Sequence, residues 1–160
     1  MTLQGLDELD RYILHVLQQD ARNASSKEIA ERMDVSPSTV RKRIQRLENQ
    51  GVIAGYRADV DFAKAGYQLR VQIVCTAPIT EREELAARAL EVPGVVSVRE
   101  LAAGAENLLV HTVATDDDDL TRIASALSEL GLAISDELLI RGERFVPFHR
   151  FAAEADEADG

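Results

Sequence analysis

The sequence has a single cysteine, no tryptophan and no long apolar run. Because Cys75 has no cysteine partner in the chain, an intrachain disulfide is excluded. Chains without disulfides are typical of reducing compartments, so a cytoplasmic location is expected. No apolar run approaches the roughly 18 residues that a transmembrane helix needs. The acidic start MTLQGLDELD is unlike a signal peptide.

The residues that usually carry catalysis or bind metals are also scarce. The three histidines, His15, His111 and His149, have no second histidine or cysteine at metal-ligand spacing. Cys75 alternates with apolar residues, which predicts a buried thiol rather than a nucleophile. The nucleophile elbow G-x-S-x-G, the phosphate-binding P-loop and the dinucleotide motif G-x-G-x-x-G are all missing. No enzyme activity, metal or cofactor is therefore predicted.

Lysine is rare although charge is abundant. The formal net charge is -10, and only three of the 18 basic residues are lysine. Surplus carboxylate with arginine favoured over lysine resembles the composition of proteins from salt-loving archaea. An acidic protein from a GC-rich genome is the alternative interpretation. The apolar fraction of 46% is enough for a folded core, so general disorder is excluded.

The charge is distributed unevenly along the chain. Residues 1–60 hold nine Lys/Arg and nine Asp/Glu, a net charge of zero. The remainder therefore holds 9 of the 18 basic and 19 of the 28 acidic residues, a net charge of -10. Such asymmetry indicates two modules with different partners.

The first 61 residues predict a winged helix-turn-helix. Apolar residues recur at helical spacing over residues 7–19, with Asp7 as N-cap. Ser25 and Glu28 form a capping-box pattern that opens a second helix. Ser36 caps a third helix that begins at Pro37 and ends before Gly51, and residues 52–61 read as two short strands. Three helices and a small hairpin define this fold.

The third helix carries an unusual group of cations. Val40, Ile44 and Leu47 share its buried face. No acidic residue stands between Ser36 and Leu47, and the basic residues there are Arg41, Lys42, Arg43 and Arg46. Because this helix follows a capped helix and a tight turn, it corresponds to a recognition helix that enters the DNA major groove. A solvated surface is the alternative for any basic face.

The second part of the chain changes to a strand period. Leu69, Val71, Ile73 and Cys75 alternate with other residues, and a capping-box pattern from Thr80 to Glu83 precedes a helix. Two strands at 95–101 and 107–115 form a hairpin, the acidic run 116–119 opens a second helix, and a long strand spans 133–148. The order predicts a ferredoxin-like βαββαβ unit in an α+β protein.

The strands have apolar residues at both parities, although helices are expected on only one face of the sheet. Another subunit is therefore expected to cover the second face, which predicts a homodimer. The predicted organisation is a DNA-binding domain at 1–61, a linker at 62–68, the βαββαβ domain at 69–151 and an acidic disordered tail at 152–160.

The segments LDELDRYILHVLQQDAR and SSKEIAERMDVSPSTVRKRIQRLENQGVIAGY, followed by the βαββαβ pattern, resemble the Lrp/AsnC family of feast/famine regulators. The resemblance runs from Leu6 to Phe151. It implies transcription regulation, commonly of amino-acid or nitrogen metabolism, and a βαββαβ domain of the RAM type. It also implies dimers that stack their sheets face to face and often assemble into tetramers or octamers.

Many proteins of this family bind a free amino acid near the hairpin between the second and third strands. The usual hairpin has a glycine, two variable residues and an aspartate, and the corresponding residues here are Gly104, Ala105, Glu106 and Asn107. Asn107 lacks the charge that would pair with an α-ammonium group, and charge-assisted hydrogen bonds are roughly twice as strong as neutral ones. Glu106 can supply that charge, or the site takes another effector, or the hairpin binds nothing.

The resemblance and the helix pattern together predict the DNA contacts. Ser36 and nearby backbone N–H groups are expected at phosphate, and Ser38, Thr39 and Lys42 at base edges. Arg41, Arg43 and Arg46 are expected at phosphates or groove walls. Arg43 has an alternative role, which is to tie the helix to its own domain. Because neutralising phosphates makes binding salt-dependent, a protein adapted to high salt is expected to show a shallow salt dependence.

The sequence leaves two alternative functions open. Siroheme decarboxylases share the two-domain framework and place histidine and aromatic residues near the hairpin and third strand. The stretch ELAAGAENLLVHTV has one histidine and no aromatic residue there, so haem-like absorbance would be the discriminating observation. A DNA-bending protein without sequence preference is the other alternative, which a comparison of random and selected sites would separate.

Overall fold

The computed structural model describes residues 5–102 and 104–152. The chain divides into two compact units. Unit 1 contains the residues up to Ala58 together with those from Arg144 onward, and unit 2 contains Asp59–Glu143. Each unit has its own hydrophobic core. The predicted acidic tail lies outside the described residues, apart from Ala152.

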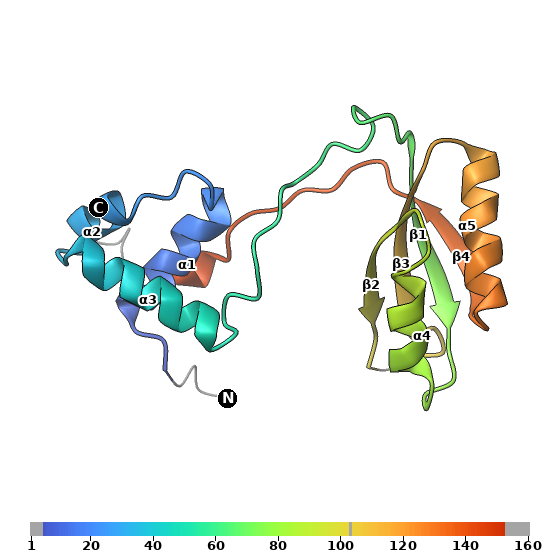
Figure 1. The fold of residues 1–160 in the computed structure, drawn as a ribbon, viewed down its shortest axis with the longest axis horizontal. Helices are drawn as coiled ribbons and strands as arrows, with labels where there is room; N and C mark the ends of the chain where they lie inside the picture. The colour runs from blue at the N-terminus through green and yellow to red at the C-terminus, as the bar shows by residue number, and fades with distance from the viewer. Residues whose placement is uncertain (1–4, 103, 153–160) are drawn as a thin grey trace. The chain divides into compact units, whose positions relative to one another are not determined.

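Unit 1 is built on three helices, α1 (Glu8–Asp20), α2 (Ser26–Arg32) and α3 (Pro37–Asn49), which pack against one another (Figure 1). The N-caps are the residues that the sequence predicts, Asp7, Ser25 and Ser36. The core residues come from all three helices, and they are Leu9, Ile13, Leu14, Ile29, Ala30, Val40 and Leu47. The apolar periodicity of the sequence therefore identified the buried faces.

The turn between α2 and α3 depends on a left-handed residue. Asp34 has φ of 51°, a conformation that aspartate and asparagine tolerate better than other side chains do. The turn is closed by the backbone N–H of Val35, which donates to the carbonyl of Ala30 at 3.0 Å. Ser36 then starts α3 without an intervening loop. The short connection fixes α3 against α2, as a helix-turn-helix requires.

The prediction of two strands at 52–61 is wrong, because this stretch contains no strand. Val52 and Ile53 both donate their backbone N–H to the carbonyl of Leu47, so the chain folds back onto the end of α3. The hydroxyl of Tyr56 donates to the Glu48 carboxylate at 2.8 Å. Local contacts with α3 therefore shape this segment in place of a strand ladder.

The end of the described chain belongs to unit 1, whereas the sequence placed everything up to residue 151 with the second domain. A short 3₁₀ helix, η1 (His149–Phe151), contacts α1. The backbone N–H of Phe148 donates to Gln18 Oε1 at 3.1 Å, and Phe151 packs against the core of the three helices. This segment completes the apolar surface of α1.

Unit 2 is an antiparallel sheet with strand order β2-β3-β1-β4. The strands are β1 (Leu69–Thr76), β2 (Val95–Glu100), β3 (Leu108–Ala114) and β4 (Ala133–Leu139). The helices α4 (Arg82–Ala89) and α5 (Asp117–Glu129) connect them in the predicted βαββαβ order. The fold class is therefore confirmed.

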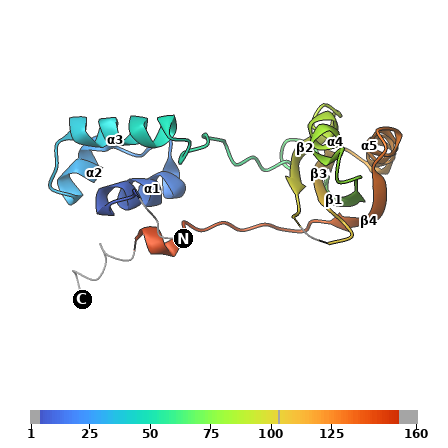
Figure 2. The ribbon, with the colours of Figure 1, turned by 90° about the horizontal axis from the view of Figure 1, so that it is seen from below.

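Both helices of unit 2 cover the same face of the sheet (Figure 2). Val71, Ile73 and Cys75 of β1 point into the core beneath them, and the intervening residues Gln72 and Val74 lie on the other face. Leu138 of the edge strand β4 pairs with Gln72 on this other face and is 49% exposed. An apolar surface therefore remains uncovered in the single chain.

Two boundaries in unit 2 differ from the sequence prediction. Helix α4 starts at Arg82, and its N-cap residue Glu81 makes no side-chain capping bond, so the predicted capping box at Thr80 is absent. The last strand ends at Leu139 rather than at residue 148, because the chain beyond Ile140 leaves the ladder and joins unit 1. The acidic run behaves as predicted, since Asp116 caps α5 and accepts from Asp119 N.

Gly94 provides a test of the packing in unit 2. A Cβ added at this residue would stand 2.4 Å from Ile123 Cδ1, in the buried core below α5. Gly131 has nearly the same φ, 102° against 103°, but open space around its Cα. Gly94→Ala should therefore destabilise the protein by roughly 1–3 kcal/mol more than Gly131→Ala in urea unfolding. Equal losses for the two variants would contradict this packing.

Candidate nucleic-acid interface and effector hairpin

Three hydroxyl groups meet at the start of α3. Ser36 Oγ accepts from the backbone N–H of Thr39 at 3.1 Å. The same oxygen lies 2.8 Å from both Ser38 Oγ and Thr39 Oγ1. Ser36 is thus primarily a capping residue, while Ser38 is exposed and, among the described residues, has its hydrogen-bonding neighbour in Ser36 alone. This end of the helix presents hydroxyl donors and acceptors to solvent.

The outward face of α3 is formed by residues at helical spacing, and they are Ser38, Arg41, Lys42 and Gln45. All four are exposed. Within the described part of the chain, Arg41 and Lys42 make no side-chain hydrogen bond or ion pair. Gln45 was not among the predicted DNA contacts. Its position three residues after Lys42 could have identified it, and a glutamine amide can bond adenine through two atoms.

Arg43 and Arg46 are arranged differently, because both are bonded to α1. Arg43 Nη1 donates to Asp7 Oδ2 at 2.6 Å and to Asp10 Oδ1 at 3.1 Å. Arg46 Nη2 donates to Asp10 Oδ2. The Asp10 side chain has no exposed surface. The alternative structural role of Arg43 is therefore observed in its contacts, and Arg46 shares it.

Asp7 and Arg43 shift each other's pKa. Hydrogen bonding to Asp7 is the main reason that the pKa of Arg43 is raised, with Asp10 adding to it. Partial burial by itself would raise the pKa of Asp7, but bonds from the Asp10 backbone and from Arg43 outweigh it and lower that pKa. A lowered carboxyl pKa stabilises the folded state above the unfolded value, and this contribution disappears as the pH falls through the folded pKa.

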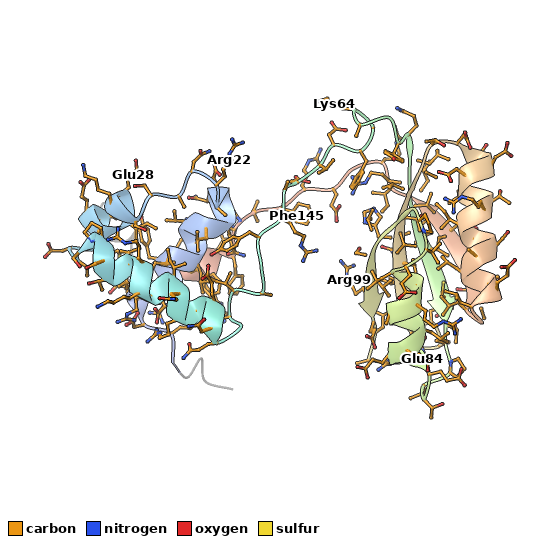
Figure 3. The ribbon with its side chains drawn as sticks, in the orientation of Figure 1. Arg22, Glu28, Lys64, Glu84, Arg99 and Phe145 are labelled. Atoms are coloured by element: carbon orange, nitrogen blue, oxygen red, sulfur yellow. The ribbon has the colours of Figure 1, made fainter. Side chains whose placement is uncertain are left out.

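Other basic residues of unit 1 lie outside the recognition helix. Arg57 is exposed and without a side-chain partner among the described residues. Arg57 directly follows Tyr56, whose hydroxyl donates to Glu48 near the end of α3. Arg22, which lies just after α1, points away from the helices of its unit (Figure 3). Neither residue was predicted as a DNA contact, because the sequence offers no periodic pattern in these connections.

The hairpin between β2 and β3 is closed by Asn107. Its Nδ2 donates to the Ala77 carbonyl at 2.8 Å, and its Oδ1 accepts from Ala77 N at 2.9 Å. Its backbone N–H donates to the Cys75 carbonyl at 3.1 Å. The side chain is 6% exposed and therefore extends the pairing between β3 and the end of β1. Only an amide with this orientation satisfies both Ala77 groups.

The remaining predicted effector residues are exposed. Gly104, Ala105 and Glu106 face solvent, and residue 103 lies outside the described chain. The Ala105 carbonyl accepts from Thr76 Oγ1 at 3.0 Å, so the hairpin is fixed to β1 at two points. Glu106 is the carboxylate of this hairpin. Any charge for a ligand ammonium group at these four residues has to come from Glu106, since Asn107 is neutral and buried.

The isolated cysteine and the strand histidine are packed side chains. Burial raises the pKa of Cys75 to about 11, so the thiol is protonated at neutral pH. Burial is also the main reason that the pKa of His111 is lowered, and Arg70 and Arg99 add to this effect. Over residues 5–102 and 104–152, no group of three acidic, histidine or cysteine side chains is placed to hold a metal ion. The helices in these ranges are too short and polar to span a bilayer.

A helix-turn-helix with a basic, partner-free helix face, joined to a βαββαβ unit, defines a winged helix-turn-helix DNA-binding protein. A family model described as winged helix-turn-helix DNA-binding matches residues 6–54. The regulator LrpA1 of Halobacterium salinarum is 38% identical over 133 residues, 83% of this chain and 85% of that protein. The regulator AldR of Mycolicibacterium smegmatis is 34% identical over 122 residues, 74% of this chain and 70% of the relative.

Solved structures give the same result. The crystal structure of MtbAldR matches with a TM-score of 0.72 at 28% identity, covering 88% of this chain and 97% of that one. The leucine response regulatory protein LrpA of Mycobacterium tuberculosis has the same fold, with a TM-score of 0.74 at 24% identity, covering 88% and 95%. The chain belongs to the Lrp/AsnC family of DNA-binding transcriptional regulators. These relatives are named as regulators, which agrees with the prediction that the chain is not an enzyme.

The two bonds of Asn107 predict the result of Asn107→Asp. The introduced carboxylate would face the Ala77 carbonyl without a donor, which should destabilise the fold by roughly 1–3 kcal/mol at neutral pH. Its folded pKa would be raised, so the loss relative to wild type should shrink as the pH falls towards the ordinary aspartate value of about 3.9. Urea unfolding at several pH values measures this difference. Glu106→Gln, one exposed residue earlier, is the control and should unfold like wild type throughout.

Proposed function

We propose that this regulator reads specific DNA sites through the exposed face of α3. Ser38, Thr39 and Lys42 would contact base edges, and Arg41 would contact phosphate or the groove wall. The observation that carries the proposal is that Arg41 and Lys42 are exposed and unpaired within the described chain. Ser36 would orient the helix N-terminus towards phosphate through its capping bond. The exposed Gln45 is a further candidate for base recognition.

A homodimer is proposed to form through the open face of the sheet, with tetramers or octamers as higher assemblies. The exposed apolar residues Leu138, which pairs with Gln72 on the open face, and Val96 support a covered face, since soluble monomers seldom leave such patches in water. Two recognition helices related by a two-fold axis would read an inverted repeat. The proposed domains are 1–61 for DNA binding and 69–151 for assembly, although residues from Arg144 onward contact the DNA-binding unit.

The hairpin Gly104–Asn107 is proposed as the effector site for a free amino acid, with Glu106 facing the ammonium group. Its exposed residues and its fixation to β1 support this assignment. Control of amino-acid or nitrogen metabolism would follow. A haloarchaeal source is supported by the acidic composition and by the relative from Halobacterium salinarum. Binding to DNA also supports a cytoplasmic location.

Loss of Lys42 tests the DNA-reading face. Lys42→Ala should weaken binding to a site selected from random DNA by roughly 5- to 150-fold, the equivalent of one base contact of about 1–3 kcal/mol. Binding to unselected DNA should weaken less, because only one charge is lost. Fluorescence anisotropy with both duplexes measures the ratio of the affinity for the selected site to the affinity for unselected DNA. Lys64→Ala removes the same charge from the connecting segment and should leave the ratio unchanged; an equal loss on both duplexes with Lys42→Ala would refute base reading by this residue.

The effector proposal predicts a stabilising ligand. Thermal unfolding in molar KCl with each common amino acid should show one chemical class that stabilises the protein by about 2.7 kcal/mol at 100 times its Kd. Glu106→Gln should abolish the shift if this carboxylate pairs with the ammonium group. Its unfolding without ligand is the control. A shift that survives in the variant, or none in wild type, would remove the hairpin from consideration as an amino-acid site.

A further inference from the structure

We infer that Asp10 is a specificity-determining residue, which together with Asp7 withholds Arg43 and Arg46 from the phosphates of DNA. The inference rests on the proposed role of α3 in DNA reading. It assigns a function to Asp7, the N-cap of α1, and to Asp10 within α1, which is not itself the reading helix. It also divides the four cations of α3 into two pairs with different roles.

The contacts of Asp10 carry this inference. The carboxylate has no exposed surface and accepts bonds from the backbone N–H of Asp7, from Arg43 and from Arg46. The Asp7 carboxylate accepts from the Asp10 backbone N–H at 3.0 Å and from Arg43 at 2.6 Å. Two carboxylates thus face two guanidinium groups, and the cluster has no net charge. Because Asp10 cannot turn towards water, its bonds hold the two arginines against α1.

The geometry of α3 shows why this matters for DNA. Arg43 and Arg46 flank the buried face marked by Val40 and Leu47, and both are only partly exposed. Arg41 and Lys42 stand on the open face with no partner in the described chain. To reach a phosphate, the Arg43 guanidinium would have to break its two bonds to carboxylates. Two unpaired cations therefore remain for the DNA, rather than four.

Withholding two cations changes how binding depends on salt. Each phosphate contact contributes a slope of about -0.9 in log K against log salt, whatever the base sequence. Two contacts fewer reduce the slope by about 1.8, which corresponds to roughly 12-fold less loss of affinity over a four-fold rise in salt. The contribution that is removed is the sequence-independent one. Selectivity between sites then depends more on the base contacts of Ser38, Thr39 and Lys42.

The same bonds explain why arginine stands at these positions at all. A shorter or apolar residue at 43 or 46 would remove one of the two guanidinium partners of the buried Asp10 carboxylate, which is costly for a charged group. The paired arginines instead link α3 to α1 on one flank and so set the rotation of α3 about its own axis. Asp10 is accordingly a positioning residue, with no contact of its own to DNA.

The first experiment compares four glutamine variants on a short random-sequence duplex. A random duplex offers Lys42 no selected base, so its charge, like that of Arg41, is expected at phosphate. Arg41→Gln and Lys42→Gln should then each make the salt slope shallower by about 0.9. Arg43→Gln and Arg46→Gln should leave the slope unchanged, even where the fraction of active protein is lower. If part of a variant is inactive, and that part is the same at every salt concentration, log K shifts by a constant. Its slope against log salt then does not change. A loss of about 0.9 with either Arg43→Gln or Arg46→Gln would overturn the inference.

The second experiment releases the arginines. Asp10→Asn keeps the size of the side chain and removes its charge, so Arg46 loses its carboxylate partner and should reach phosphate, while Arg43 is held only by Asp7. Binding to random DNA should become tighter at low salt, and its slope should steepen by up to about 0.9 for each arginine released. The ratio of selected-site to random-site affinity should fall. Glu8→Gln removes the same charge from an exposed residue of α1 and should change none of these quantities.

The outcomes separate this inference from the proposed function. Wild-type protein that fails to prefer a selected duplex over a random one would contradict DNA reading by α3, and the inference would fall with it. A selective wild type whose slope is unchanged in the folded Asp10→Asn protein would leave DNA reading intact and refute only the withholding of the arginines. A steeper salt slope together with lost selectivity in the Asp10→Asn protein supports both DNA reading by α3 and the withholding of the arginines.

Discussion

The DNA-binding unit depends on one buried carboxylate. Asp10 lies on the apolar stripe of α1, with Ile13 and Leu14 three and four residues further along the helix. Its burial is possible because two guanidinium groups from α3 and a backbone N–H satisfy its oxygens. The pairing fixes α3 relative to α1, and the face of α3 that remains outward then contains the free cations. Charge pairing in the interior thus decides which charges reach the surface.

The sheet unit uses a neutral group in a comparable way. Asn107 extends the ladder between β3 and β1 by matching both polar groups of Ala77 with one amide. The aspartate usual at this position in the family could accept from Ala77 N but could not donate to its carbonyl. The asparagine therefore fixes the hairpin more completely and leaves it without charge at this residue. An effector site here would have to draw its negative charge from Glu106.

Much of the fold could be predicted from local patterns. Apolar residues at helical or strand spacing located the helices and strands, and Asp7, Ser25 and Ser36 marked the helix starts. Residues 52–61 were predicted wrongly because local contacts with the end of α3 replace the ladder there. The end of the last strand was predicted wrongly because the chain instead makes a distant contact with α1. The partners of Arg43 lie 33 and 36 residues away, beyond any periodic pattern. A charged Asp10 within an apolar stripe was the available signal of a buried partner.

The pairing of Arg43 and Arg46 with α1 can be followed by nuclear magnetic resonance of the arginine side chains during titration with a selected DNA duplex. Guanidinium groups held by carboxylates keep their N–H signals protected from exchange with water. We expect the Arg43 and Arg46 signals to be protected in the free protein and to stay in place on DNA binding, while the Arg41 signal shifts. Movement of the Arg43 or Arg46 signals to phosphate-bound positions would show that Asp10 does not withhold these arginines from DNA.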